Sequence, residues 1–266
     1  MPAPMNRFEA LRHRTVELAG MAALGVAVST CPAQAQSAST KAQPAVKNAE
    51  QGPLAKELAE RSAEFADKAD PEMLRIFTEA IDRLAESGVL EGVKTKGDKA
   101  PDFELSDANG NTVNFKDLLA EGPVVLTFYR GGWCPYCNLQ LRAYQENLDK
   151  FQALGANLVA ISPEKPDNSL DTTEKNELEF AVLSDPGNEV ADKFGLRYEI
   201  DPVLTERFAP ILEGYNGDES HTLPLTATYV INTDGTIKFS YITADYKLRA
   251  EPSDIINALK HIKMGH

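Results

Sequence analysis

Two cysteines three positions apart are the residues in this sequence best suited to chemistry. They are Cys134 and Cys137, the two ends of the C-x-x-C motif in Trp133-Cys134-Pro135-Tyr136-Cys137. A disulfide between two sulfurs at a helix start forms and breaks easily, so such a pair can cycle between dithiol and disulfide. The same spacing makes a poor structural staple, because a loop this short constrains the unfolded chain very little. The motif therefore predicts a redox centre.

A strand followed by a helix is expected to hold this pair. The apolar run over 123–130 predicts a strand in the centre of a sheet, and residues 134–154 predict one long helix after it. Pro135 suits the first helical position, where its missing N–H would be unpaired anyway. Cys134 then faces free backbone N–H groups and the positive end of the helix dipole, which both favour a thiolate. Cysteines in such places have pKa values lowered from about 8.5 to roughly 3.5–7.5.

Two neighbours of the pair are supporting candidates. Arg130 favours the thiolate in the same way if its side chain turns toward the sulfurs. Trp133 is the only tryptophan, and it either shields the thiolate and presents a flat surface to a partner or simply packs the loop. Both interpretations stay open at this point.

Composition narrows the classes of site and partner. The formal net charge of −13 at pH 7 argues against nucleic acid as a partner. The chain has 3 cysteines and 4 histidines, with no second cysteine pair and no histidine near the motif. A zinc site is therefore disfavoured, and we expect neither a metal nor another cofactor.

The order of the other elements predicts an α/β fold. Strands and helices alternate through residues 95–266, and the turn at 232–235 lies between two strands that read as an antiparallel hairpin. This order predicts a mixed sheet flanked by helices on both faces. Upstream, residues 53–94 carry apolar side chains at helical spacing, broken at Asp70-Pro71, and predict an N-terminal helical extension of two helices.

The N-terminus has the features of an export signal. Basic residues precede a short apolar run over 18–28, and an Ala-x-Ala cleavage site follows at 33–35. We therefore expect residues 1–35 to be a signal peptide and residues 36–52 a flexible linker. The mature chain is then periplasmic or secreted, and it has no membrane span because the apolar run is too short.

Two alternatives to a cleaved export signal stay open. The segment is otherwise a leader on a cytosolic protein, or Cys31 is lipidated after cleavage. Lipidation is disfavoured, because Thr30 is a poor residue immediately before a lipidated cysteine.

The sequence resembles known families of redox proteins. Cys134-Pro135-Tyr136-Cys137 matches the glutaredoxin active site, and Trp133-Cys134 is similar to thioredoxin. The chain from about 95 to 262 instead resembles the peroxiredoxin-like branch of the alkyl hydroperoxide reductase/thiol-specific antioxidant (AhpC/TSA) family. The segments that carry this resemblance are GDKAPDFEL (97–105), the strand ending in Phe128-Tyr129, LVAIS (158–162), LSD (183–185) and TYVI (228–231) followed by Asp234-Gly235. The resemblance implies a thioredoxin-like fold and a thiol-dependent peroxidase that a thioredoxin-like reductant recycles.

The active-site pattern of peroxiredoxins is only partly present. That pattern is P-x-x-x-T/S-x-x-C with an arginine from a later strand. Aligning its peroxide-attacking cysteine with Cys137 puts Cys134 at the Thr/Ser position and Arg130 at the Pro position. No arginine directly precedes the strand at 228–231, and Arg249 is a substitute that the sequence cannot place. By the logic of thioredoxins Cys134 is the nucleophile, so the attacking sulfur stays undecided.

Thr226 and Pro224 are the candidates to face the pair across the site. Thioredoxins carry a cis-proline just before the strand that lies opposite the C-x-x-C motif. Thr226 occupies that place here, and Pro224 lies two positions earlier. Pro224 becomes the facing proline only if the loop before the strand is longer than in thioredoxins.

Other polar residues are given structural interpretations. His221 is read as an exposed loop histidine in preference to a general acid, and Asp185 as a helix or turn cap. The three acidic residues after the strand at 158–162 are read as a solvated rim: Glu164, Asp167 and Asp171.

Three functions are compatible with the sequence. The first is a thiol peroxidase that reduces hydroperoxides through a Cys134/Cys137 dithiol–disulfide cycle. The second is a protein thiol–disulfide oxidoreductase, in which Cys134 attacks a partner's disulfide. The third is a non-enzymatic redox-sensing module. Neither the electron donor nor the oligomeric state follows from the sequence.

Overall fold

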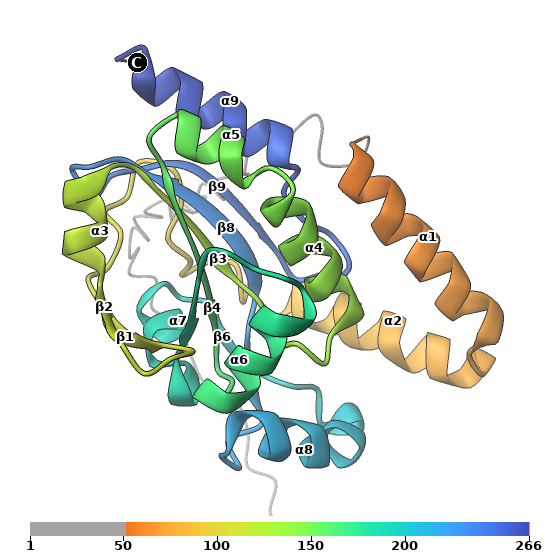
Figure 1. Ribbon diagram of the computed structural model, residues 1–266. Coiled ribbons are helices and arrows are strands. Elements are labelled where there is room, and N and C mark those ends of the chain that lie inside the picture. The colour runs from red at the N-terminus through yellow and green to blue at the C-terminus, as the bar shows by residue number, and fades with distance from the viewer. Residues whose placement is uncertain (1–51, 266) are drawn as a thin grey trace, which may run out of the picture. The chain divides into compact units, whose positions relative to one another are not determined.

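A mixed sheet of seven strands forms the centre of the fold (Figure 1). The computed structural model describes residues 52–265. In spatial order the strands are β2 (Thr112–Asn114), β1 (Glu104–Asp107), β5 (Ala181–Ser184), β4 (Asn157–Ser162), β3 (Val124–Phe128), β8 (Thr226–Ile231) and β9 (Ile237–Thr243). The three strands in the middle of this order are parallel, and the outer pairs are antiparallel. The predicted α/β class is confirmed.

Helices cover both faces of the sheet. One face packs against α4 (Pro135–Gln145), α5 (Leu148–Ala153) and α9 (Pro252–Lys263), and the other against α3 (Phe115–Glu121) and α7 (Glu189–Lys193). The remaining elements are α1 (Pro53–Lys68), α2 (Pro71–Glu86), α6 (Pro166–Lys175), a 3₁₀ turn (Pro186–Asn188), β6 (Arg197–Glu199), α8 (Pro202–Asn216) and β7 (Thr222–Pro224). No helix between residues 52 and 265 is long and apolar enough to cross a membrane.

The position of β3 in the middle of the sheet explains why its sequence is apolar without interruption. Successive side chains of a strand point to opposite faces, and both faces of this sheet are covered. Val125 lies in the core beneath α4 and α5, whereas Val124 and Leu126 lie in the core beneath α3 and α7. All five residues of β3 are buried. The strand therefore holds a fixed position, and the loop that follows it starts from a rigid edge.

The structure differs from the sequence-based expectation in three places. The single helix expected over 134–154 is two helices, because Asn147 leaves helical geometry with φ −111° and ψ 6° and forms the N-cap before α5 begins at Leu148. The sequence predicts a helix over 202–212, whereas α8 continues to Asn216 and ends where Gly217 adopts a left-handed conformation. The paired strands β6 and β7 were not predicted, since each has three residues and pairs only with the other.

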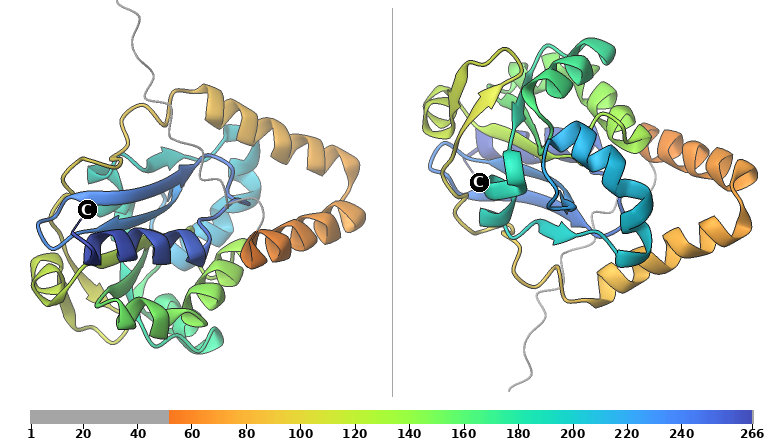
Figure 2. Two further views of the ribbon diagram at one scale, coloured as in Figure 1. Left: turned by 90° about the horizontal axis from the view of Figure 1, so that it is seen from above. Right: turned by 90° about the horizontal axis from the view of Figure 1, so that it is seen from below.

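The N-terminal extension forms two helices that reach the domain at different places. Figure 2 shows α1 and α2 meeting at a tip and diverging toward the domain. Asp70 caps α2 by accepting hydrogen bonds from two backbone N–H groups. Leu54 and Leu58 of α1 join the core beneath α4, and Phe77 of α2 contacts Phe208 of α8 with ring centroids 6.0 Å apart. The expected signal peptide and nearly all of the linker lie outside the described residues.

Candidate active site

The loop between β3 and α4 places the cysteine pair at the edge of the sheet. Cys134 is the N-cap residue of α4, and Pro135 follows at the first helical position. Two glycines make the loop possible. Gly131 has φ +147°, and a Cβ there would lie 2.3 Å from Nε1 of Trp133. A Cβ on Gly132 would lie 2.0 Å from the Thr172 hydroxyl, so the loop packs against its surroundings with no room to spare.

The two cysteines are reduced, adjacent and almost completely enclosed. Cys134 is 1 % exposed and Cys137 is 0 % exposed. Burial opposes ionisation of Cys134, but a hydrogen bond from the Cys137 thiol and the charges of Arg130 and Arg249 lower its pKa to about 5. Burial and the neighbouring sulfur raise the pKa of Cys137 well above its usual value. The first proton lost by the pair therefore leaves a thiolate on Cys134 and a thiol on Cys137.

Arg130 lies inside a cage of aromatic rings beside this thiolate. Its guanidinium carbon is 4.4 Å from the ring centroid of Tyr246 and 5.0 Å from that of Trp133. The side chain is buried, and its Nε has no hydrogen-bond partner among residues 52–265. The sequence left open whether Arg130 turns toward the sulfurs, and in the structure its charge acts on Cys134. Trp133 packs the loop and also covers the guanidinium.

Arg249 reaches the other sulfur from the loop between β9 and α9. Its Nη2 donates to Sγ of Cys137 over 3.3 Å, and the side chain is 2 % exposed. Nε donates to Oε1 of Gln140 over 2.7 Å, and Nη1 donates to the carbonyls of Tyr246 and Leu248. The sequence left open whether this arginine reaches the site, and the structure places it there.

A buried polar cluster beneath the pair holds Gln140 in place. Its amide nitrogen donates to the hydroxyls of Thr127, Tyr144 and Thr228 over 3.0–3.2 Å. This leaves the amide oxygen aimed at Arg249. A buried polar group is costly unless it is satisfied, so the cluster fixes the direction of the guanidinium.

Glu164 corrects one prediction of the sequence. It was expected on a solvated acidic rim, yet it is 0 % exposed. Its Oε1 accepts from the backbone N–H of Gly132 over 2.8 Å, and its Oε2 accepts from the Tyr129 hydroxyl over 3.0 Å. Parallel strands end at the same edge of a sheet, so a carboxylate shortly after β4 comes next to the loop that follows β3. The position of Glu164 two residues after β4 was therefore the feature of the sequence that could have predicted its place beside the loop.

The structure also gives the positions and contacts of the other residues singled out in the sequence. Asp185 caps α7 by accepting from the N–H groups of Val190 and Ala191 over 2.9 Å, as predicted. His221 contacts Glu213 at 3.0 Å. Thr226 is buried at the start of β8, and Pro224 pairs with Arg197 in the small second sheet. Asp167 and Asp171 are exposed, as expected.

Comparison with known proteins places this architecture in a family. Residues 96–240, which include the cysteine pair, match the AhpC/TSA family. The chain belongs to the AhpC/TSA family. It is 29 % identical over 164 residues to peroxiredoxin Bcp of Escherichia coli, covering 62 % of this chain and 94 % of Bcp. It is 30 % identical over 159 residues to chloroplastic peroxiredoxin Q of Triticum aestivum, covering 60 % of this chain and 64 % of that protein.

A solved structure shares the fold of this AhpC/TSA protein. The crystal structure of peroxidoxin BcpB from Mycobacterium tuberculosis superposes with a TM-score of 0.51 at 24 % identity, covering 63 % of this chain and 97 % of that one. These matches confirm the predicted thioredoxin-like fold with an N-terminal extension outside the family segment. They also confirm the predicted resemblance to peroxiredoxins and, with it, a thiol-dependent peroxidase.

The pH dependence of stability in this AhpC/TSA protein is expected to report on Glu164. Burial raises the pKa of this carboxyl from 4.5 to about 7, so between these values the folded protein holds a proton that the unfolded chain has lost. Stability contributed by the protonated carboxyl is therefore lost as the pH rises from about 4.5 to 7, by about 3 kcal/mol. Ionisation of Cys134, whose pKa is lowered to about 5, adds stability over part of the same range, so the comparison is between variant and wild type. From pH 5 to pH 8 we expect the stability of Glu164→Gln to change by about 3 kcal/mol more favourably than that of the wild type, measured by urea unfolding.

The control for this prediction is Asp171→Asn on the exposed surface of α6. This variant removes an acidic group without changing the buried network, so its pH dependence should match that of the wild type. An unchanged difference between pH 5 and pH 8 in Glu164→Gln would show that the carboxyl of Glu164 is not the group responsible.

Proposed function

We propose that this protein reduces hydroperoxides with Cys134 as the attacking sulfur and Cys137 as the resolving sulfur. The observation that carries the proposal is the enclosed thiolate of Cys134. It lies at the start of α4, within the field of two guanidinium groups, with the thiol of Cys137 hydrogen-bonded to it. A thiolate held in this way is a ready nucleophile at neutral pH.

The reaction cycle follows from the positions of the two sulfurs. The Cys134 thiolate attacks the terminal oxygen of the hydroperoxide, the O–O bond breaks, and the leaving oxygen takes a proton to become an alcohol or water. Cys134 is then a sulfenic acid. The Cys137 thiol displaces its hydroxyl as water and forms the Cys134–Cys137 disulfide. A dithiol reductant of thioredoxin type then reduces this disulfide by thiol–disulfide exchange and becomes oxidised itself, which restores both thiols.

Burial supports a peroxide over a protein disulfide as the substrate. A protein partner must bring its own chain within bonding distance of the attacking sulfur, because exchange proceeds through a mixed disulfide. Cys134 is 1 % exposed, with Arg130, Trp133 and Tyr246 packed beside it. A small peroxide needs far less access, and developing negative charge on its leaving oxygen meets Arg130 and Arg249. Protein thiol–disulfide exchange is therefore the second candidate.

The pH dependence of peroxide reduction tests the nature of the nucleophile. The pKa of Cys134 is about 5, so its thiolate fraction rises through pH 5 and is nearly complete by pH 7. We expect the rate constant for hydrogen peroxide in stopped-flow mixing of the reduced protein to rise about tenfold per unit below pH 5 and to level off above pH 6. A free cysteine mixed in parallel is the reference. A protein that reacts no faster than free cysteine at pH 7 would refute the proposal.

We further propose that the chain is exported before it acts. The basic start, the short apolar run and the Ala-x-Ala site at 33–35 support this. The mature protein would then hold only the two active-site cysteines, because cleavage removes Cys31. The mass of the protein purified from the cell envelope tests the idea, since an intact N-terminus or a lipid on Cys31 would contradict it.

A further inference from the structure

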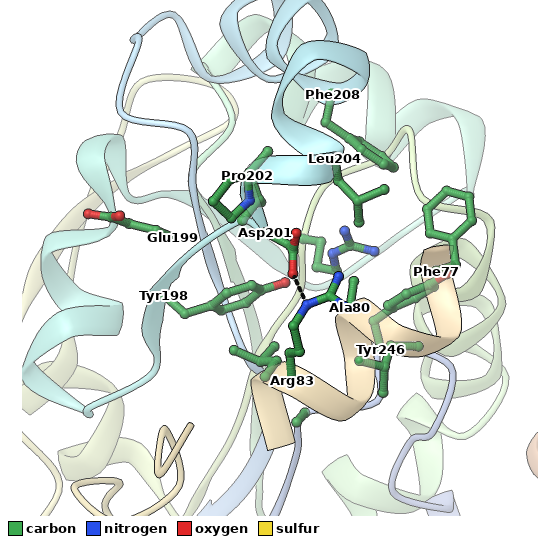
Figure 3. Close-up of a pocket in the computed structure, with 15 residues that line it drawn as sticks. Phe77, Ala80, Arg83, Tyr198, Glu199, Asp201, Pro202, Leu204, Phe208 and Tyr246 are labelled. Carbon is green, nitrogen blue, oxygen red and sulfur yellow. Dashed lines mark hydrogen bonds and ion pairs between the residues drawn. The ribbon is translucent and has the colours of Figure 1, made fainter. Parts of the chain in front are cut away.

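A cavity of about 220 Å³ lies between α2 and α8, and Arg130 is among the residues that line it (Figure 3). The walls contributed by the two helices are almost entirely apolar: Phe77, Ala80, Ile81, Leu84, Leu204 and Phe208. Water gains little from such walls. An apolar cavity of ~150 Å³ is large enough to hold benzene, so the body of this one suits a small ring or a short branched chain.

Arg130 is the buried charge of this cavity, with 7 % of its surface exposed. The ring centroids of Trp133 and Tyr246 lie 5.0 and 4.4 Å from its guanidinium carbon. Ring faces stabilise the charge, but they carry no lone pair for an N–H donor. Nε has no hydrogen-bond partner among residues 52–265. A buried donor without a partner is costly, so this atom is suited to a ligand oxygen that accepts a hydrogen bond.

The acidic residues around the cavity do not neutralise Arg130. Asp201 accepts from Arg83 over 2.7 Å, and Figure 3 shows the carboxylate of Glu199 directed away from this ion pair. No ion pair joins Arg130 to a carboxylate within the part of the chain that the structure describes. Burial raises the pKa of Tyr198, which also lines the cavity, so its phenol stays neutral at pH 7. The cavity thus combines apolar walls with a buried cation that lacks a carboxylate partner.

We propose that this cavity binds a small organic carboxylate, whose apolar body lies between α2 and α8 and whose oxygen accepts a hydrogen bond from Nε of Arg130. A buried carboxylate is stable only beside a positive charge and a donor, and Arg130 supplies both. A neutral ligand of the same shape gains less there. The ligand is held at Arg130 and touches neither cysteine, so the inference goes beyond the peroxidase function and does not depend on it.

Arg130 is then shared between the ligand and the sulfur of Cys134. Its charge is one of the causes that lower the pKa of this thiol. A carboxylate bound to Arg130 offsets part of that charge, so the thiolate forms at a higher pH than in the free protein. The effect is reciprocal, and the thiolate form of the protein holds the ligand more weakly than a form in which residue 134 is uncharged. Occupancy of the cavity is thereby coupled to the protonation state of the redox pair.

Calorimetric titration of the reduced protein at pH 7 tests the site with cyclohexanecarboxylate and with cyclohexanecarboxamide, a neutral molecule of the same shape. We expect the carboxylate to bind about tenfold more tightly or better, because hydrogen bonds to charged groups are the stronger ones. Ala80→Leu fills the cavity from the buried face of α2 and should weaken carboxylate binding about tenfold. Ala85→Leu makes the same change on the exposed face and should not alter binding. Leu204→Phe narrows the cavity from α8 and serves if Ala80→Leu does not fold.

Two further variants test the charges. Arg130→Met removes the cation and the donor, so the preference for the carboxylate over the amide should disappear. Cys134→Ser cannot form a thiolate, and it should bind the carboxylate about tenfold more tightly than the wild type because no second anion then acts on Arg130. The uncharged amide should bind equally to Cys134→Ser and to the wild type.

The outcomes that contradict the assignment are distinct from failure of the peroxidase function, because these titrations contain no peroxide. Equal affinity of the wild type for the carboxylate and the amide would overturn the carboxylate site. Equal weakening by Ala80→Leu and Ala85→Leu would show that the ligand does not occupy this cavity. Equal carboxylate binding by Cys134→Ser and the wild type would refute the coupling to the redox pair.

Discussion

Cys134→Ser is expected to abolish peroxide reduction, whereas Cys137→Ser is expected to react once and stop. In the second variant the Cys134 thiolate still attacks the peroxide, because the introduced hydroxyl can replace the thiol as a hydrogen-bond donor. The resulting sulfenic acid has no resolving sulfur and persists. One equivalent of peroxide is then consumed per chain, and a sulfenic-acid reagent such as dimedone should label Cys134 in the mass spectrum.

The opposite labelling pattern has a definite meaning. Alignment with the peroxiredoxin pattern puts the attacking cysteine at Cys137, and Arg249 does contact that sulfur at 3.3 Å. If Cys134→Ser forms a stable sulfenic acid on Cys137, the alignment is right and our assignment of the two sulfurs is wrong. Mixed disulfides trapped on Cys134 in Cys137→Ser, without any reaction with peroxide, would instead favour protein thiol–disulfide exchange.

Arg249→Met is expected to impair both stability and activity. The variant leaves the amide oxygen of Gln140 and the carbonyls of Tyr246 and Leu248 without their hydrogen-bond donor. Arg249 is only 2 % exposed, so water has little access to these acceptors. Unsatisfied buried acceptors cost about 1–3 kcal/mol each, partly relieved by relaxation, so we expect a loss of about 2–5 kcal/mol in the free energy of unfolding. Urea unfolding of the reduced protein measures this loss.

The effect of Arg249→Met on the rate has a separate cause. The positive charge of Arg249 lowers the pKa of Cys134. In the proposed reaction it also stabilises the negative charge that develops on the leaving oxygen. Loss of one such group typically costs about 10²–10³-fold in rate. We expect a loss of this order at pH 7 for protein that is still folded, with partial recovery at higher pH as more thiolate forms.

Two further substitutions separate charge from general disruption. Arg249→Lys keeps the positive charge but loses the planar guanidinium with its several N–H donors. We therefore expect its peroxide rate to stay closer to the wild-type value than that of Arg249→Met, while its free energy of unfolding falls. Arg142→Met makes the same change on the exposed surface of α4, where the arginine donates to Asn176 over 2.9 Å, and it should leave the peroxide rate unchanged. An Arg249→Met protein with wild-type rate would show that the arginine is merely structural.

The contribution of Arg249 explains how the family pattern is altered here. Peroxiredoxins bring in an arginine from a later strand, and no arginine directly precedes β8 in this chain. The structure shows an arginine arriving from the loop between β9 and α9, which lies far along the chain but close in space. The same charge thus reaches the sulfurs by another route. Residue order alone does not reveal such an exchange, because it depends on how the loop returns over α4.

The sequence alone predicts several local features of the structure correctly. Pro135 directly after Cys134 indicates a helix start, since proline is favoured at the first helical position. The uninterrupted apolar run of β3 indicates a strand covered on both faces. The turn at 232–235 indicates a hairpin, which β8 and β9 form. Each of these inferences rests on interactions between residues that are near one another in sequence.

Other features could not be predicted from the local sequence pattern. Glu164 looked like a surface residue because acidic side chains usually are, and only the meeting of β4 with the loop after β3 encloses it. The break between α4 and α5 was missed because the apolar pattern continues through it. The short strands β6 and β7 carry too few residues for a detectable period.

Residue types and their spacing along the chain were enough to predict the cysteine pair as a redox centre, its place at the start of a helix and the family of the domain. The identity of the sulfur that carries the negative charge came from the three-dimensional packing alone. That outcome depends on Arg130 and Arg249, whose positions relative to Cys134 and Cys137 are set by the loops around α4. Coulomb energies fall with distance through space, and spacing along the sequence does not measure that distance.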